Sequence, residues 1–112
     1  MNKLASIYFL QGMGLHTVSP NVILSRNERD IKRQVDDFYY NYRPGWVLRC
    51  GELPDRCGKV EVGLPWDIVH GKEELVRQIR AFQKDVGERY AVFCHTVDEM
   101  VRGELCLLRE AK

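Results

Sequence analysis

The chain has 112 residues, 45% of them hydrophobic and 29% charged, with 17 Lys and Arg against 16 Asp and Glu. This size and composition are typical of a globular protein, so we treat residues 1–112 as a single domain and exclude extensive disorder. The balanced charge excludes a global basic field for nucleic acid, and no apolar run approaches the ~20 residues that span a bilayer. The N-terminal residues lack the long apolar core of a signal peptide, so we expect a cytoplasmic protein without membrane contact.

The four cysteines restrict the chemistry of the chain. Cys50, Cys57, Cys94 and Cys106 have spacings that match no common zinc pattern, and without an export signal we expect reduced thiols. Cys94 stands beside His95, but neighbouring side chains on a strand point to opposite faces. We therefore expect neither a metal site nor an activated Cys–His pair.

The first third of the chain predicts two helices with a strand between them. Apolar spacing over residues 2–11 indicates a helix, and residues 21–24 read as a short strand. Ser25 and Glu28 stand three apart, as in a capping box, so we predict that Ser25 is the N-cap of the second helix. The buried stripe of that helix comprises Ile31, Val35, Phe38 and Tyr42. Its four turns are expected to end before Pro44-Gly45.

The remaining residues predict four strands and a third helix. The strands are expected at 46–50, 59–62, 90–94 and 104–108, with a polar loop at 51–58 and an irregular stretch at 63–71. The third helix starts near Gly71 or Lys72, carries the stripe Leu75, Ile79 and Phe82, and ends at Gly87. The order α-β-α-β-β-α-β-β predicts an α+β fold, in which two or three helices pack on a mostly antiparallel sheet of four to five strands.

Arg49 is the first candidate site residue. It ends an apolar strand beside a glycine-bearing loop, where its guanidinium could hold a phosphate or carboxylate through two hydrogen bonds. Arg56 and Lys59 flank the same loop and could close over a bound anion. The alternative is that Arg49 is an exposed arginine at the end of a strand, paired with Glu52 or Asp55.

Exposed aromatic residues are candidates for binding a partner. Trp66 follows Gly63-Leu64-Pro65, and a tryptophan in such a loop can anchor a partner or seal the core. Tyr39 and Tyr40 lie beside the buried stripe of the second helix, where they can line its edge or a partner surface. With Arg33 nearby, they could also form a stacking platform for single-stranded nucleic acid, although the neutral net charge disfavours that partner.

Several phrases, taken in chain order, resemble the N-terminal, nucleotide-clasping half of ATP-grasp proteins, in particular the pyruvate/phosphoenolpyruvate-binding branch. Residues 14–20 are similar to the phrase that follows the family's first helix, and residues 21–25 look like the next strand. Residues 46–49 are similar to the strand that carries a phosphate-binding Lys or Arg. Glu73-Glu74-Leu75 looks like the start of the family's later helix, and residues 102–104 resemble the start of its last strand. Lys3 matches a lysine that opens the family's first helix, although an N-terminal lysine is usually solvated.

The resemblance implies that Arg49, with Arg56 and Lys59, binds ATP or a phosphorylated metabolite weakly. The family's Mg²⁺-ligating residues belong to a second half. We therefore expect this chain to form one side of a site that a partner chain completes. The chain is not expected to be catalytic alone. The first alternative is a non-enzymatic protein–protein interaction or homo-oligomerisation module that uses a strand edge or the Trp66 loop. The second alternative is a small nucleic-acid-binding protein.

Overall fold

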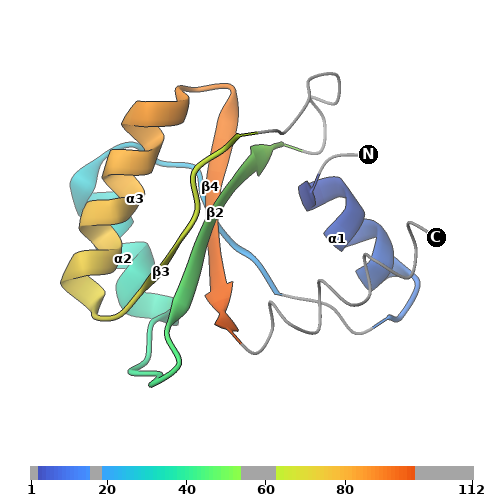
Figure 1. Ribbon diagram of the computed structural model, residues 1–112, viewed down its shortest axis with the longest axis horizontal. Coiled ribbons are helices and arrows are strands. Elements are labelled where there is room, and N and C mark those ends of the chain that lie inside the picture. Colours follow the sequence, from blue (N-terminus) through green and yellow to red (C-terminus); the bar gives the residue numbers. More distant parts are fainter. Residues whose placement is uncertain (1–2, 16–18, 54–62, 98–112) are drawn as a thin grey trace.

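The computed structural model describes residues 3–15, 19–53 and 63–97 as three helices and a four-stranded antiparallel sheet (Figure 1). The helices are α1 (Lys3–Gly12), α2 (Glu28–Phe38) and α3 (Lys72–Val86). The strands are β1 (Asn21–Ile23), β2 (Trp46–Glu52), β3 (Asp67–Val69) and β4 (Tyr90–Thr96). The predicted α+β class and mostly antiparallel sheet are confirmed. None of these helices is long and apolar enough to cross a membrane.

The strands lie in the order β1-β4-β2-β3, and each adjacent pair is antiparallel. As a result β1 runs parallel to β2 with β4 between them, and β3 runs parallel to β4 with β2 between them. Each of these two parallel connections contains a helix, α2 in the first and α3 in the second. The two longest strands, β2 and β4, thus form the middle of the sheet, and the three-residue strands β1 and β3 form its edges.

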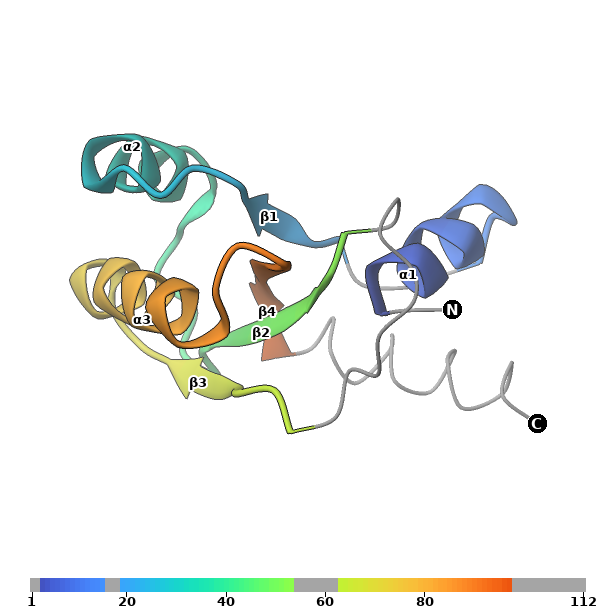
Figure 2. The ribbon, with the colours of Figure 1, turned by 90° about the horizontal axis from the view of Figure 1, so that it is seen from above.

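Helices cover both faces of the sheet (Figure 2). On one face, α2 and α3 enclose the main core, whose buried members are Ile23, Ile31, Val35, Leu48, Cys50, Val69, Leu75, Val76, Ile79, Val92 and Cys94. On the other face, Leu4 and Ile7 of α1 pack against Ala91 and Phe93 of β4. Because side chains alternate along a strand, Arg49 and Phe93 lie on the α1 side, whereas Cys50 and Cys94 lie on the α2/α3 side.

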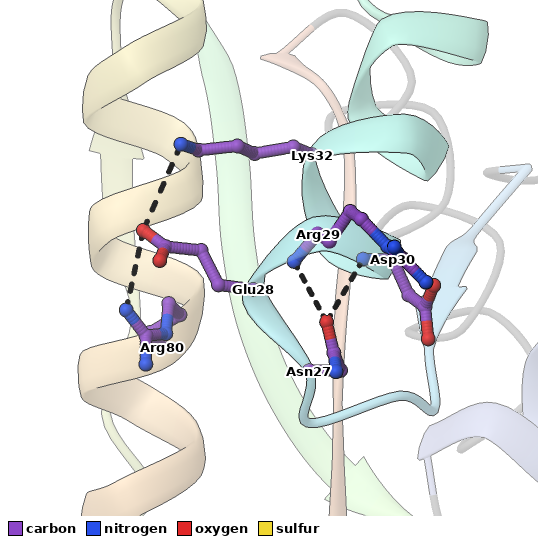
Figure 3. A network of polar contacts seen from close by, with 6 residues as sticks. All are labelled: Asn27, Glu28, Arg29, Asp30, Lys32 and Arg80. Atoms are coloured by element: carbon purple, nitrogen blue, oxygen red, sulfur yellow. Dashed lines mark hydrogen bonds and ion pairs between the residues drawn. The ribbon is translucent and has the colours of Figure 1, made fainter.

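The N-cap of α2 is Asn27, so the prediction of Ser25 was wrong. The Asn27 side chain accepts hydrogen bonds from the backbone N–H groups of Arg29 and Asp30, at 2.9 and 3.4 Å (Figure 3). Ser25 lies two residues earlier, where its Oγ accepts a hydrogen bond from the Asn27 N–H at 3.1 Å. Both residues are good cap formers, and the backbone of Asn27 is the one that is extended immediately before the helix.

We expect Asn27→Ala to lower the free energy of unfolding by about 1 kcal/mol, because two N–H groups at the start of α2 lose their acceptor. Asn27→Asp keeps an acceptor at that position and serves as the matched control. Chemical denaturation of the three proteins measures the effect. Equal midpoints for Asn27→Ala and the parent would show that α2 does not depend on this cap.

Helix α2 also ends earlier than predicted, at Phe38 rather than near Tyr42. Tyr39 already has an extended backbone, and its N–H makes the last helical hydrogen bond, to the Val35 carbonyl at 2.8 Å. The turn out of the helix brings the Tyr39 ring onto Trp46, with 5.7 Å between centroids and 28° between planes. Aromatic packing around Trp46 therefore ends the helix before Pro44.

Strand β3 was not predicted, because Asp67–Val69 lies in the stretch expected to be irregular. Three residues carry too little alternation to be recognised alone, and their extended state depends on pairing with Trp46–Leu48 of β2. Strand β2 is longer than predicted, since Gly51 and Glu52 continue to pair with β4. The strands predicted at 59–62 and 104–108 lie outside the described residues.

Candidate anion-binding site

Arg49 lies in the middle of β2, not at the end of a strand as predicted. It is directly opposite Phe93 of β4, and both side chains are on the α1 face of the sheet. The guanidinium carbon of Arg49 lies 5.8 Å from the centroid of the Phe93 ring, within cation–π range. The arginine is half-buried, whereas Phe93 is fully buried. The Phe93 ring therefore lies against the guanidinium of Arg49 and stabilises its positive charge.

Lys3 reaches the same part of β2 from the first turn of α1. Its Nζ donates a hydrogen bond to the backbone carbonyl of Cys50 at 3.0 Å, across 47 residues of sequence. Lys3 is half-buried, so the expectation of a solvated N-terminal lysine was wrong. Both Lys3 and Arg49 take part in further interactions besides these. Lys3 thus binds the backbone of the residue that follows Arg49, which places a second cation from a distant part of the sequence at the same strand.

The charge of Lys3 affects the pKa of the Cys50 thiol, although the thiol lies on the opposite side of the sheet. Burial raises the pKa of the Cys50 thiol to about 11, the Lys3 ammonium opposes that rise, and Asp85 adds to it. A thiol with this pKa is protonated at neutral pH and is a poor nucleophile. Cys50 is consequently part of the core rather than part of the candidate site.

Glu52 is not the partner that the alternative interpretation assigned to Arg49. Its carboxylate is fully buried, accepts a hydrogen bond from Arg89 Nε at 3.0 Å, and forms an ion pair with Arg89 Nη2 at 2.9 Å. Because Arg49 and Glu52 stand three apart on one strand, their side chains leave opposite faces of the sheet. Asp55, the other partner considered, lies outside the described residues, as do Arg56 and Lys59.

Cys94 and His95 point to opposite faces, as predicted. The Cys94 thiol lies in the core under α2 and α3, where burial raises its pKa. His95 is buried on the α1 face, with its ring 6.2 Å from that of Phe93 and its Nδ1 3.0 Å from the Thr96 carbonyl oxygen. Within the described ranges, no group of three or more His, Cys, Asp or Glu side chains is arranged to hold a metal ion.

The predicted partner-binding aromatics have different surroundings. Trp66 is 65% exposed and Tyr40 is 54% exposed, so both rings are accessible. Tyr39 instead stacks on the buried ring of Trp46, and its hydroxyl accepts a hydrogen bond from the Gly71 N–H at 3.0 Å. Tyr39 therefore holds the start of α3 against the end of α2.

A concave surface lies between α2 and α3, on the far side of the sheet from Arg49. This groove of about 560 Å³ is lined by Glu28, Lys32, Asp36, Lys72, Glu73, Val76, Arg77 and Arg80. Oppositely charged side chains pair across the two helices. Arg80 forms an ion pair with Glu28 at 3.3 Å (Figure 3), and Lys72 forms one with Asp36 at 2.9 Å. These exposed pairs join the helices weakly, and the groove does not contain an unbalanced cluster of cations.

Comparisons with protein-family models, with curated proteins and with solved structures find no match to this chain. The candidate site is therefore supported only by the geometry of this chain. It comprises a strand arginine, a helix lysine and the phenylalanine ring under the arginine.

Proposed function

We propose that this chain is an ATP-grasp-like half-domain that holds the phosphate groups of a nucleotide or a phosphorylated metabolite. The observation that carries the proposal is that Lys3 binds the Cys50 carbonyl, next to Arg49 on β2, while the Arg49 guanidinium lies over Phe93 on the α1 side of the sheet. An arginine offers a planar fork of N–H donors to phosphate oxygens, and a lysine adds a compact positive charge. Both residues start from rigid elements, which favours a positioned site over a diffuse basic surface.

The setting of Arg49 suits it for binding an anion. The Phe93 ring attracts the guanidinium through its π face and so favours a position of the cation on the α1 side of β2. Half-burial reduces screening by solvent, so the attraction between Arg49 and a phosphate is stronger than on an open surface. Arg56 and Lys59 remain proposed members of the site that would close over the anion.

The proposed activity is binding without turnover by the chain alone. Phosphoryl transfer depends on metal ions and cations that spread the charge of the transferring group. The resemblance places the carboxylates that bind Mg²⁺ in a second half, so a partner chain would supply them. The isolated protein is expected to bind ATP weakly and not to hydrolyse it.

A thermal-shift series with ATP, ADP, AMP and inorganic phosphate tests the proposal. A ligand at 100 times its Kd adds about 2.7 kcal/mol of stability, which for a chain of this size raises Tm by roughly 10–20 °C. The shift should grow with the number of phosphates and shrink as salt is added. Adenosine, which lacks phosphate, is the control. An equal shift with adenosine, or no shift with any phosphate, would contradict the proposal.

A further inference from the structure

Among the described helices, α1 alone lies on the face of the sheet opposite to α2 and α3 (Figure 2). It packs there through Leu4 and Ile7 against Ala91 and Phe93 of β4. In the described part of the chain this cluster has four buried members, whereas the core under α2 and α3 has eleven. Elements with fewer buried apolar contacts open at a lower free energy. We therefore expect α1 to separate from the sheet more readily than α2 or α3.

Helix α1 has little stability of its own. It has 10 residues, and isolated helices shorter than about 12–15 residues are marginal in water. Its first turn contains no acidic residue and its last turn no basic residue, so no side-chain charge of favourable sign lies at either end of the helix dipole. Lys3 instead places a positive charge at the positive end. The helix therefore depends on its packing against the sheet, and an anion beside Lys3 would stabilise its first turn.

The candidate anion site and the packing of α1 share two residues. Lys3 is the first residue of α1, and its Nζ binds the carbonyl of Cys50, next to Arg49 on β2, at 3.0 Å. Phe93 belongs to the cluster that holds α1, and its ring centroid lies 5.8 Å from the guanidinium carbon of Arg49. If α1 left the sheet, Lys3 would leave with it and the buried Phe93 ring would lose the packing on its α1 side. The complete site thus exists only while α1 is in place.

Helices α2 and α3 are not linked to the site in this way. Both cover the face to which Cys50 and Cys94 point, whereas Arg49 and Phe93 lie on the other face. A change in the packing of α2 or α3 therefore leaves Lys3 and the Phe93 ring where they are. Residues of the core under α2 and α3 supply the controls for the experiments below.

We propose that the position of α1 regulates the anion site: anion binding requires α1 to be packed on the sheet, and a bound anion in turn holds α1 there. This inference rests on the proposed function and adds its regulation. The two effects are reciprocal. The factor by which packing of α1 raises the anion affinity is also the factor by which the anion raises the ratio of packed to separated α1. A factor that removes α1 from the sheet would release the anion.

Leu4 and Ile7 can change the packing of α1 without touching the anion. Both are fully buried, and neither side chain carries a charge or a hydrogen-bonding group. The apparent Kd of a site equals its intrinsic Kd divided by the fraction of molecules that are competent to bind. A variant in which α1 is packed for about a tenth of the time should therefore bind the anion about tenfold more weakly.

Isothermal titration with ATP compares the parent, Leu4→Ala and Leu75→Ala. Leu4→Ala should weaken ATP binding about tenfold or more. Leu75→Ala is the matched control, because it removes the same atoms from a fully buried position in the other core. It should lower stability and leave the ATP affinity of the folded protein nearly unchanged. Ile7→Val, which removes one methylene, should give a smaller loss of affinity and serves if Leu4→Ala does not fold.

Amide hydrogen exchange of the unmodified chain tests the reciprocal effect. Without ATP, residues 7–12 should exchange faster than β4, because α1 separates from the sheet without global unfolding. ATP at ten times its Kd should slow exchange in residues 7–12 about tenfold, since only the packed form binds. Exchange in residues 7–12 that is as slow as in β4 without ATP, or that ATP does not slow, would overturn the proposal.

Failure of the inference and failure of the proposed function give different results. A parent that binds no ATP overturns both. ATP binding that is lost in Arg49→Ala but kept in folded Leu4→Ala and Ile7→Val supports the proposed function and overturns the regulation by α1. Equal losses of affinity in Leu4→Ala and Leu75→Ala would also overturn it, because the effect would then be one of general stability.

Discussion

Gly45→Ala is expected to cause a large loss of stability, about 2–5 kcal/mol in the free energy of unfolding, from two causes that act together. Gly45 has φ of +102°, a conformation that L side chains rarely adopt. A Cβ at this position would also lie 2.8 Å from His70 Nε2 and 2.9 Å from Ile68 Cγ2. The second cause requires His70 and the edge strand β3 to shift away from β2.

Two glycines separate these causes in denaturation experiments. Gly71 has φ of +97° and nothing within 4 Å of an added Cβ, so Gly71→Ala reports the backbone strain alone. Gly12 has an ordinary φ and open space, so Gly12→Ala should be close to neutral. The predicted order of destabilisation is Gly45 above Gly71 above Gly12. Equal losses at Gly45 and Gly71 would show that the contact with His70 and Ile68 is unimportant.

Phe93→Ala is the second substitution with a large expected effect, about 3–5 kcal/mol of destabilisation. Phe93 is fully buried between β4 and α1, in contact with the cluster of Leu4 and Ile7. Truncation leaves a cavity that α1 can fill only by moving toward the sheet. It also removes the ring under Arg49.

Phe93→Leu separates packing from the cation–π contact. Leucine keeps most of the apolar volume, so the stability loss should fall to about 1–1.5 kcal/mol, while the aromatic support of Arg49 is lost completely. Phosphate affinity should then drop in Phe93→Leu although the fold is retained. Denaturation midpoints and phosphate binding are measured on the same samples. A stable Phe93→Ala protein would show that α1 does not pack on β4 as described.

The helices and strands with regular apolar spacing were predictable, because the apolar residues that recur along them are buried. Leu75 and Ile79 recur on one side of α3 and are fully buried, so apolar spacing located the helix correctly. Phe82 was placed on the same stripe but is only partly buried, packed against the edge of the core. The alternation in β4 likewise predicted that Cys94 and His95 would point apart.

Features that depend on contacts between distant residues could not be predicted. The extended state of Asp67–Val69 requires β2 as a neighbour, and the position of Lys3 requires α1 to lie against β2. The choice between Ser25 and Asn27 as N-cap depends on a backbone turn that either residue could make.

The binding of ATP by the Arg49→Ala variant tests the central claim most directly. Isothermal titration of the parent, Arg49→Ala and Arg33→Ala compares the loss of one positive charge at two places. Arg33 is exposed on α2, on the far side of the sheet. A charge-assisted contact is worth about 1.5–3 kcal/mol, so Arg49→Ala should weaken ATP binding roughly 10- to 100-fold, and Arg33→Ala should leave it nearly unchanged. An equal affinity in the parent and Arg49→Ala, with both proteins folded, would contradict the proposed phosphate-binding site.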